Sequence, residues 1–312
     1  MNSGRMGIGI ISAGKVGAAL GSGLRSLGHT ITGAYASSDA SIERLETMLP
    51  GVPNLQIEEI VSRSEVVLLA VPDDQLAPLI SGLAKLNLWQ PGQILIHTAG
   101  RYGTEVFAPV RNSGAIGIAM HPAMTFTGTS LDVARLQGCP FAITAPAAFQ
   151  AIGIAIAAEL GGEPVVIAEG DRIGYHAALA YSANYLVTLV NEGMTALREL
   201  GIPDSGAYLR PLLSAALEGA LSSGDALQTG PIVRGDYGTV AAHLAVIDEM
   251  AEGISNLKNW PENYRQLGKA TIDRAHERGI VSDFIAQEIT DLLTINPGNS
   301  FEIPAQQGET EK

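Results

Sequence analysis

The sequence has little cysteine, few positive charges and no long apolar run. Its only cysteine, Cys139, excludes an internal disulfide bond and any metal site built from cysteines. The 19 Lys and Arg residues against 32 Asp and Glu give a net charge of −13, which argues against nucleic acid or an anionic membrane surface as a partner. No stretch is apolar for long enough to form a membrane helix, and glycines and Lys15 interrupt the apolar start. We therefore expect a cytoplasmic protein that holds no metal.

Apolar residues make up 46% of the 312 residues, enough for a large core and for two domains. Through residues 1–168, short apolar segments typical of buried parallel strands alternate with helical patterns. Strands are predicted at residues 6–11, 30–35, 54–56, 65–71, 93–97, 115–120, 141–144 and 164–167. This alternation predicts an α/β domain with a doubly wound, mostly parallel sheet.

The second part of the chain, residues 169–295, carries helical patterns alone. Helices are predicted at residues 172–200, 204–222, 238–252, 261–278 and 282–293. Residues 296–312 are polar and aperiodic, and we expect a disordered tail there. The Ala- and Leu-rich helices after Pro203 leave apolar surface that is best buried against a second copy, which predicts a homodimer built from this domain.

A dinucleotide-binding turn is predicted between the first strand and the first helix. Six residues connect them: Ser12, Ala13, Gly14, Lys15, Val16 and Gly17. Gly14 lets backbone approach a pyrophosphate, Gly17 lets the helix pack on the strand, and the helix N-terminus supplies free N–H groups and the positive end of its dipole. Ser12 replaces the usual first glycine, which we expect to be tolerated if its φ stays negative. We predict that these six residues bind the pyrophosphate of a dinucleotide.

The end of the second strand bears on which dinucleotide is bound. An NAD site usually places Asp or Glu there for the ribose 2′-hydroxyl, but this chain has Ser37 and Ser38. With no carboxylate to repel a 2′-phosphate and two hydroxyls able to donate to one, NADP is favoured over NAD. Asp39 is expected to cap the next helix, with the ribose as an alternative partner. Arg44 is interpreted as a solvated surface charge, although it can assist the phosphate.

Residues that follow the strands are candidates because ligands bind beyond the carboxyl ends of a parallel sheet. Val71 and Pro72 follow the central strand and Thr98 follows the next, so we expect them to contact the cofactor. His121 follows a further strand, where an imidazole can hydrogen-bond a substrate carbonyl and deliver a proton. A structural role for His121, bonded to a loop carbonyl, is equally open. For His97 the structural role is favoured.

The first long helix of the second domain and a later loop supply further candidates. His176 and Asn184 are eight residues apart, about 12 Å along a helix axis, so they cannot both hold one substrate atom. Arg234 lies in a loop between helices and suits a substrate carboxylate, which a guanidinium grips with two hydrogen bonds. A structural ion pair with Asp236 is the competing interpretation. We take His121, His176, Asn184 and Arg234 as candidate catalytic residues and expect them to line one pocket.

Five segments together resemble a known family: Gly14-Lys15-Val16-Gly17, Ala70-Val71-Pro72-Asp73-Asp74, His121-Pro122, Asp171-Arg172 with Tyr175-His176 and Ser182-x-Asn184-Tyr185-Leu186, and Thr229-Gly230-Pro231-x-x-Arg234-Gly235-Asp236. They resemble a family of proteins, described as oxidoreductases, in which a Rossmann-like domain is joined to a helical domain of unknown function. More distantly, the chain is similar to pyrroline-5-carboxylate reductases, ketopantoate reductases and deazaflavin-dependent NADP reductases. The resemblance implies an NADP-linked reductase fold whose helical domain often dimerises, and it fixes no substrate.

Two departures narrow what the resemblance implies. Ketopantoate- and hydroxyisobutyrate-type enzymes carry a catalytic Lys on the first helix of the second domain, and this helix has none, so His176 would replace it. Pyrroline-5-carboxylate reductases usually have Lys-Pro after the central strand, where this chain has Pro72-Asp73.

Three hypotheses remain open. The favoured one is an NADPH-dependent reductase of a small carbonyl or imine acid, with the substrate carboxylate held by Arg234 and the proton given by His121 or His176, or failing these by water or Tyr175. The second is a non-enzymatic dinucleotide sensor whose helical domain binds a protein. The third is a reductase that uses a deazaflavin as its second substrate.

Overall fold

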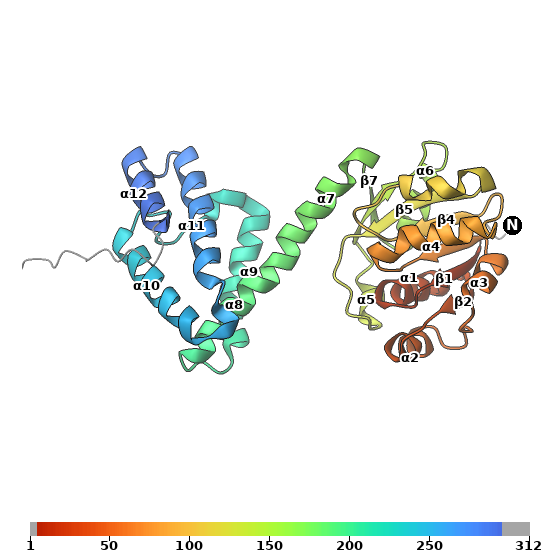
Figure 1. Cartoon of the computed structure of the whole chain (residues 1–312), viewed down its shortest axis with the longest axis horizontal. Coiled ribbons are helices and arrows are strands. Elements are labelled where there is room, and N and C mark those ends of the chain that lie inside the picture. Colours follow the sequence, from red (N-terminus) through yellow and green to blue (C-terminus); the bar gives the residue numbers. More distant parts are fainter. Residues whose placement is uncertain (1–4, 295–312) are drawn as a thin grey trace, which may run out of the picture. The chain divides into compact units, whose positions relative to one another are not determined.

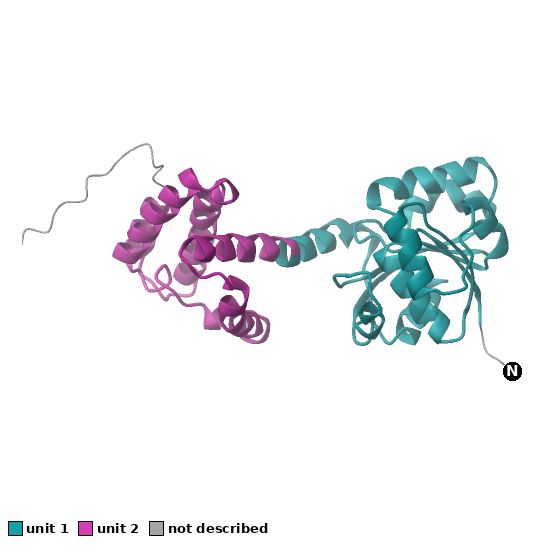
Figure 2. Ribbon diagram, turned by 90° about the horizontal axis from the view of Figure 1, so that it is seen from below, with its two compact units in different colours: residues 1–183 teal, residues 184–312 magenta. Residues whose placement is uncertain are grey.

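The computed structural model describes residues 5–294, and the chain divides into two compact units, 1–183 and 184–312 (Figures 1 and 2). The predicted tail, residues 296–312, lies outside the described residues. Within residues 5–294, no helix is long and apolar enough to cross a membrane.

The first unit is built on a seven-stranded sheet in the order β2-β1-β3-β4-β5-β6-β7. The strands are β1 (Gly7–Ile11), β2 (Thr30–Tyr35), β3 (Val66–Leu69), β4 (Ile94–His97), β5 (Ile116–Pro122), β6 (Pro140–Thr144) and β7 (Glu163–Val166). All neighbouring pairs are parallel except β5 and β6, which are antiparallel. This confirms the α/β prediction of a doubly wound, mostly parallel sheet.

Helices cover both faces of the sheet (Figure 1). The helical segments of this unit are α1 (Lys15–Ser26), α2 (Asp39–Met48), α3 (Ile57–Arg63), α4 (Asp73–Lys85), η1 (Glu105–Ser113), α5 (Leu131–Ala134), α6 (Gln150–Glu159), η2 (Glu169–Asp171) and α7 (Arg172–Leu179). On one face, Val66 and Leu68 of β3 pack in a core with α1, α2 and α6. On the other, Val67 and Leu69 pack with α3, α4 and η1. Because both faces are buried, the strands form unbroken apolar runs in the sequence.

The strand predicted at residues 54–56 is wrong. Asn54 forms only an isolated bridge to Ala34, and its side chain takes over the pairing by accepting from the N–H of Ala36 at 3.1 Å and donating to the carbonyl of Ala36 at 3.0 Å. From Gln56, which forms a capping box with Glu59, the chain enters α3. A helix this short shows too few turns for a helical period to stand out in the sequence.

The single long helix predicted at residues 172–200 contains a different turn near its middle. α7 passes into a π-helical turn, η3 (Ala180–Asn184), before α8 (Tyr185–Glu199) begins. The two compact units divide in sequence at the end of this turn, between Ala183 and Asn184. π-Helical turns are rare, and those that occur are often at functional sites. This one contains Asn184, which the sequence predicts as a candidate catalytic residue.

Over its described residues, 184–294, the second unit contains helices and no strand, as the sequence predicts (Figure 2, magenta). Its segments are α8 (Tyr185–Glu199), α9 (Ser205–Ser223), η4 (Gly224–Leu227), α10 (Tyr237–Gly253), η5 (Ser255–Leu257), α11 (Trp260–Glu277) and α12 (Asp283–Thr294). α10, α11 and α12 share an apolar core that includes Val240, Ile272 and Ile289. α8 packs on α9 and η5.

Candidate functional site

The turn after β1 has the shape of a dinucleotide-binding turn, with one departure at Ser12. Ser12 has a φ of +79°, in the left-handed region that favours glycine. The condition under which the serine was expected to be tolerated, a negative φ, is therefore not met, and the turn imposes a glycine conformation on a serine at a cost of about 1 to 2 kcal/mol. The N–H of Ala13, which is fully buried, donates to the carbonyl of Tyr35 at 2.8 Å and ties the turn to β2.

Gly14 and Gly17 serve different purposes in this turn. A Cβ atom at Gly17 would lie 2.1 Å from the carbonyl oxygen of Ser12 and 3.1 Å from Cβ of Ala70, so only glycine lets α1 pack this closely on the sheet. A Cβ atom at Gly14 would meet only Oγ of Ser12, at 3.4 Å. Gly14 is the N-cap of α1 and offers no side-chain cap, so the first N–H groups of the helix remain for an anion. The turn therefore fits a pyrophosphate group.

The N-terminus of α2 follows β2 directly. Ser38 is the N-cap and forms a capping box with Ser41, with Oγ of Ser38 accepting from the N–H of Ser41 at 3.3 Å. Asp39 was expected to cap this helix, but it lies in the first turn. Ser38 is the cap because Oγ of Ser41, three residues further on, accepts from the N–H of Ser38 and completes the capping box. The residue three beyond Asp39 is the apolar Ile42, which cannot do the same. Ser37 and Ser38 are exposed at this N-terminus, where the helix dipole favours an anion.

Two cationic side chains, Lys15 and Arg44, lie beside the loop that follows β5. A Cβ atom on Gly128 of that loop would lie 2.8 Å from Nε of Arg44 and 2.9 Å from Cγ of Lys15. The buried carboxylate of Asp132 fixes the loop, because it accepts from the N–H and hydroxyl of Thr127 at 3.1 and 2.8 Å and from the N–H of Gly128 at 2.7 Å. Arg44 is half-buried and its Nε has no hydrogen-bond partner among the described residues. Arg44 is therefore only partly solvated, with its Nε turned away from solvent beside this loop.

The ends of β3 and β4 place Val71, Pro72 and Thr98 at the carboxyl edge of the sheet. Val71 and Thr98 are half-buried, and Pro72 is the N-cap of α4. The N–H of Thr98 donates to the carbonyl of Leu69 at 3.3 Å, which continues the pairing of β4 with β3. Because β1, β3 and β4 are parallel, these residues share an edge with the turn after β1.

His97 has the structural role that the sequence favoured. Its ring is fully buried, Nδ1 accepts from the N–H of Ala99 at 3.2 Å, and Nε2 lies 2.9 Å from the carbonyl of Gly103. These two bonds require a neutral ring with its proton on Nε2. Burial, aided by the positive charge of Arg172, lowers the pKa of His97 to about 4. His97 therefore shapes the loop after β4 as a neutral side chain.

Three rings and one glycine form the centre of the candidate site. Nδ1 of His121 lies 2.8 Å from Oη of Tyr175 on α7. His176 packs edge-on against His121, with ring centroids 6.3 Å apart. Gly100, in the loop after β4, leaves room for both imidazoles: a Cβ atom there would lie 2.6 Å from Cδ2 of His176 and 3.1 Å from Nε2 of His121. β5 extends to Pro122, so His121 lies within the end of the strand, not after it.

A buried cation, Arg172, lies close to this cluster and binds the sheet. Its side chain is 1% exposed, Nε donates to Oγ1 of Thr144 at 2.7 Å, and Nη2 donates to the carbonyls of Ala142 and Ala119 at 3.0 and 3.3 Å. Nη1 has no hydrogen-bond partner among the described residues. All three partners are neutral, and burial lowers the pKa of Arg172. Its charge therefore acts on nearby titratable groups without a carboxylate in hydrogen-bond contact to offset it.

Burial and the charge of Arg172 determine the protonation states of His121 and Tyr175. Burial, followed by the positive charge of Arg172, lowers the pKa of His121 to about 4. Burial raises the pKa of Tyr175, and the charge of Arg172 opposes that rise. At neutral pH the pair is therefore a neutral imidazole bonded to a protonated phenol.

The other two candidate residues, Asn184 and Arg234, belong to the second unit. Asn184 is exposed at the end of η3, and Arg234 is exposed in the loop before α10. Asp236 is the N-cap of α10 and accepts from the N–H and hydroxyl of Thr239 at 3.1 and 2.7 Å. Among residues 5–294 no ion pair joins Arg234 to Asp236. The structure thus brings His121 and His176 together, while the shared pocket with Asn184 and Arg234 stays a prediction.

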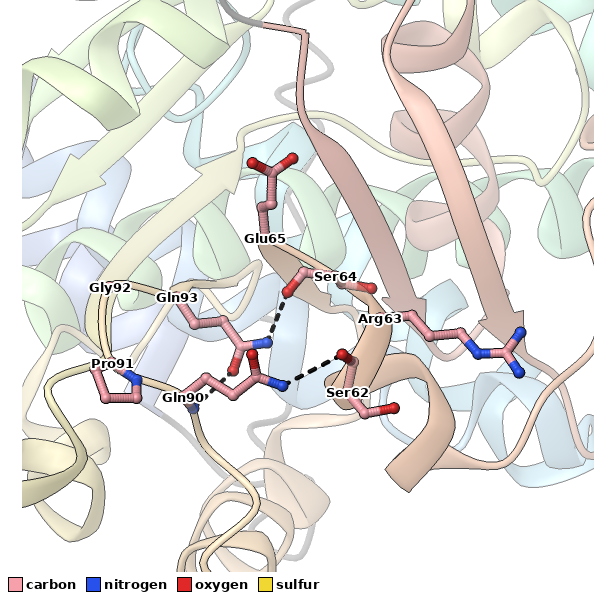
Figure 3. A pocket seen from close by; sticks show the side chains of 8 residues that line it. All are labelled: Ser62, Arg63, Ser64, Glu65, Gln90, Pro91, Gly92 and Gln93. Carbon is pink, nitrogen blue, oxygen red and sulfur yellow. Dashed lines mark hydrogen bonds between the residues drawn. The ribbon is translucent and has the colours of Figure 1, made fainter.

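The cavity in Figure 3 lies at the opposite edge of the sheet from these residues. Its volume is about 370 Å³, and it is lined by residues that precede β3 and β4: Ser62, Arg63, Ser64, Glu65, Gln90, Pro91, Gly92 and Gln93. Nε2 of Gln93 donates to the carbonyls of Val61 and Ser64 at 2.8 Å each, and Nε2 of Gln90 donates to the carbonyl of Ser62 at 3.3 Å. These side-chain amides hydrogen-bond the segment before β4 to the segment before β3, so we assign the cavity a structural role.

The sheet order, the turn after β1 and the polar residues at the carboxyl edge are those of a Rossmann-type domain. Two family models match the chain: a Rossmann-like domain over residues 1–122 and a domain of unknown function, DUF2520, over residues 139–271. The chain belongs to the proteins that join these two domains, which confirms the family predicted from the sequence.

Solved structures share this fold at low sequence identity. A proposed NADP oxidoreductase from Bacteroides fragilis has a TM-score of 0.70 and 18% identity, over 86% of this chain and 98% of its own. Pyrroline carboxylate reductase from Plasmodium falciparum, with NADP bound, has a TM-score of 0.54 and 12% identity, over 93% and 99%. An imine reductase variant from Myxococcus stipitatus, in complex with NAD+, has a TM-score of 0.54 and 18% identity, over 93% and 100%. At these identities the likeness shows the fold alone, and no curated protein sequence matches the chain.

The sequence analysis assigned no role to Gly100 of the cluster or to Arg172 beside it, and it gave Tyr175 too small a role. Gly100 carried a signal, since it follows a strand at the ligand edge within His97-Thr98-Ala99-Gly100. Arg172 stands in the Asp171-Arg172 segment that carries the family resemblance, but arginines are mostly exposed and nothing in the local pattern marks this one as buried. Tyr175 stands beside His176 in the sequence, and only the fold decides which of the two reaches Nδ1 of His121.

Proposed function

We propose that this protein is an NADP-dependent oxidoreductase that reduces a small carbonyl or imine acid by hydride transfer. The observation that carries the proposal is the hydrogen bond between His121 and Tyr175 at the carboxyl edge of the sheet, the edge that also holds the turn after β1. The likeness of the fold to pyrroline carboxylate reductase and to an imine reductase supports this class of reaction. A bound nicotinamide would supply the hydride, and the chain supplies the proton and holds the substrate.

Tyr175 is the proton donor in this proposal, and His121 positions it. The raised pKa of Tyr175 keeps the phenol protonated at neutral pH, whereas a pKa of about 4 leaves little imidazolium on His121 to donate. With its proton on Nδ1, His121 donates to Oη of Tyr175 and leaves the phenol O–H free for the substrate. The same N–H then stabilises the phenolate as it forms. This donor replaces the histidine favoured from the sequence, and His176 borders the same space as an orienting ring.

The cofactor is proposed to bind along the turn after β1 and the N-terminus of α2. The free N–H groups at the start of α1 suit the pyrophosphate. Ser37 and Ser38 offer hydroxyls at the N-terminus of α2, and the unpartnered Nε of Arg44, with Lys15 close by, supplies positive charge near it. This charge and the absence of a carboxylate at the end of β2 favour NADP over NAD.

The substrate is proposed to carry a carboxylate. Arg234 is exposed and Asp236 is occupied in capping α10, so the guanidinium is available to grip an acid group. Asn184, at the end of the π-helical turn, is proposed as a second polar contact. Both assignments require Asn184 and Arg234 to lie close to the proposed cofactor site, at the carboxyl edge of the sheet in a first unit of the same chain or of a second copy.

The proposal is tested by following the loss of NADPH absorbance with a panel of 2-keto acids and imine acids. Oxidation that depends on one of these compounds, and that is faster than with NADH, supports the proposal. A protein that binds NADPH but oxidises it with no compound in the panel would favour the dinucleotide-sensor hypothesis. A second series with a deazaflavin as acceptor tests the third hypothesis.

A homodimer built from the second unit is also proposed. Apolar side chains are exposed along α8 and α9, with Leu212 at 67% and Leu221 at 77% exposed. Surfaces of this kind are usually covered in a soluble protein, and a second copy is the simplest cover. Light scattering at micromolar concentration is expected to give the mass of a dimer, and a monomer mass would contradict the proposal.

A further inference from the structure

A buried acidic side chain in the second unit has one oxygen without a partner. Glu192 of α8 is 7% exposed, and its Oε1 accepts from Nδ2 of Asn263 on α11 at 2.7 Å. Its Oε2 has no hydrogen-bond partner among the described residues. Burying a polar oxygen without a donor is costly, so such an atom points to a donor that the chain itself does not supply.

Glu192 lines two hollows, both within the second unit. The larger has a volume of about 620 Å³, within the range of small-molecule sites, and is polar, with Asn191, Arg198 and Lys258 among its lining residues. The smaller has a volume of about 150 Å³ and is mainly apolar, with Trp260 in its wall. The residue with the unpartnered oxygen, Glu192, thus lines both the larger, polar hollow and the smaller, apolar one.

The polar hollow also offers groups that bind an anion. Lys258 and Asn259 lie at the start of α11, and Asn259, its N-cap, makes no side-chain cap bond. Pro261 has no N–H, so the N–H groups of Trp260 and Glu262 are those left for an anion. The carboxylate in the first turn, Glu262, accepts from Gln266 at 2.7 Å and is not among the lining residues. One hollow therefore combines a buried acidic oxygen with a cationic, anion-binding rim.

We propose that this hollow binds a zwitterionic small molecule of the α-amino acid type. Its ammonium group donates to Oε2 of Glu192, and its carboxylate binds Lys258 and the N-terminus of α11. An anion alone would be repelled by Glu192, and a cation alone would leave the positive rim unused. The smaller hollow beside Trp260 receives an apolar side chain. The site lies within the second unit and is independent of the proposed reductase activity.

The chain contains two tryptophans, which give the binding test an internal control. Trp260 borders the smaller hollow, whereas Trp89 is buried in the core of the first unit. The full-length protein, labelled with ¹⁵N in its indole groups, is titrated with the L-α-amino acids at millimolar concentration, and with n-propylamine and propionate as probes that carry one charge each. At least one amino acid is expected to shift the Trp260 signal and leave that of Trp89 in place, with both single-charge probes binding at least tenfold more weakly.

Three variants decide which side chains carry the binding. Glu192→Gln keeps an acceptor for Asn263 and removes the charge, and it is expected to weaken binding at least tenfold, as is Lys258→Gln. Glu199→Gln, an exposed residue of the same helix that lines neither hollow, is the matched control and is expected to bind as the wild type does. Because Lys258 is exposed, its variant keeps the test decisive even if Glu192→Gln does not fold.

Three results would overturn the proposal. In the first, no amino acid shifts the Trp260 signal, which would leave Oε2 of Glu192 to water. In the second, Glu192→Gln or Lys258→Gln, properly folded, binds the amino acid as tightly as the wild type. In the third, n-propylamine binds as tightly as the amino acid, which would make the site one for simple amines.

Discussion

Oη of Tyr175 lies 2.8 Å from Nδ1 of His121, and this bond joins the start of α7 to the end of β5. Neither ring is charged at neutral pH, because burial raises the pKa of Tyr175 and lowers that of His121 to about 4. The buried guanidinium of Arg172, which binds the backbone of β5 and β6, contributes to the low pKa of His121.

Replacing Tyr175 by Phe keeps the ring and removes the proposed proton donor. Once a substrate is known, we expect kcat to fall about a hundredfold or more, as is typical for loss of a general acid, while the affinity for NADPH stays unchanged. Tyr208→Phe, an exposed tyrosine of α9, serves as the control in steady-state assays. Unchanged turnover in Tyr175→Phe would assign the proton to another group.

The two glycines of the turn after β1 should respond differently to substitution. Gly14→Val is expected to abolish NADPH binding and leave the fold intact, since the backbone at Gly14 is extended and the new Cβ atom meets only Oγ of Ser12. Gly17→Ala is expected to destabilise the protein by about 2 kcal/mol or more, because its Cβ atom would lie 2.1 Å from the Ser12 carbonyl oxygen. Fluorescence titration and chemical denaturation separate the two effects. NADPH binding by Gly14→Val at wild-type affinity would contradict the proposed pyrophosphate site.

Cofactor preference should depend on Arg44. NADPH is expected to bind more tightly than NADH, and Arg44→Gln to reduce that preference about tenfold, the usual effect of losing one charge-assisted hydrogen bond. Arg63→Gln, an exposed arginine of α3, is the control in intrinsic-fluorescence titrations. If the wild type binds NADH as well as NADPH, Asp39 becomes the residue to test as a ribose partner.

Ser12→Gly should stabilise the first unit. Glycine adopts a φ of +79° without strain, and the relief exceeds the extra entropy of the unfolded chain, for a gain of about 0.5 to 1 kcal/mol in the free energy of unfolding. Ser12→Ala retains the strained φ and should show no such gain. Urea denaturation of both variants distinguishes backbone strain from loss of the hydroxyl.

Stability should fall on mild acidification. The pKa values of His97 and His121 are lowered from 6.5 to about 4, so between these values the unfolded chain binds protons that the folded chain does not. The free energy of unfolding therefore decreases as the pH falls from 6.5 towards 4, by up to about 3 kcal/mol for His97 alone, and is insensitive to these groups above neutrality. In denaturation curves measured across this pH range, the free energy of unfolding of His97→Gln should depend less steeply on pH than that of the wild type. An equal slope in that variant would contradict the assignment.

The architecture could be predicted because its determinants are local. Strands such as β3 are buried on both faces and form unbroken apolar runs, and Gly14 and Gly17 have their usual spacing. The helices of the second unit start at capping residues visible in the sequence, such as Asp204 and Asp236.

The errors arise where a distant contact decides the outcome. Ser12 adopts a positive φ in a turn that the bond from Ala13 to Tyr35 ties to β2, and Asn54 pairs with Ala36 through its side chain. Arg172 was not recognised, because its acceptors belong to two strands far upstream of α7. The joint pocket with Arg234 depends on an arrangement of units that local sequence patterns do not encode.

The antiparallel pair of β5 and β6 coincides with the border between the two family models. The Rossmann-like match ends at residue 122 and the DUF2520 match begins at residue 139, yet β6 and β7 complete the sheet of the first unit, with His121 opposite Ala142. Arg172, also within the second match, donates to the carbonyl of Ala119 on the far side of that border. Recombination at this border would therefore cut through a single folding unit. A foreign partner would have to supply a strand that pairs antiparallel to β5, as β6 does, and an arginine able to bind across that pair.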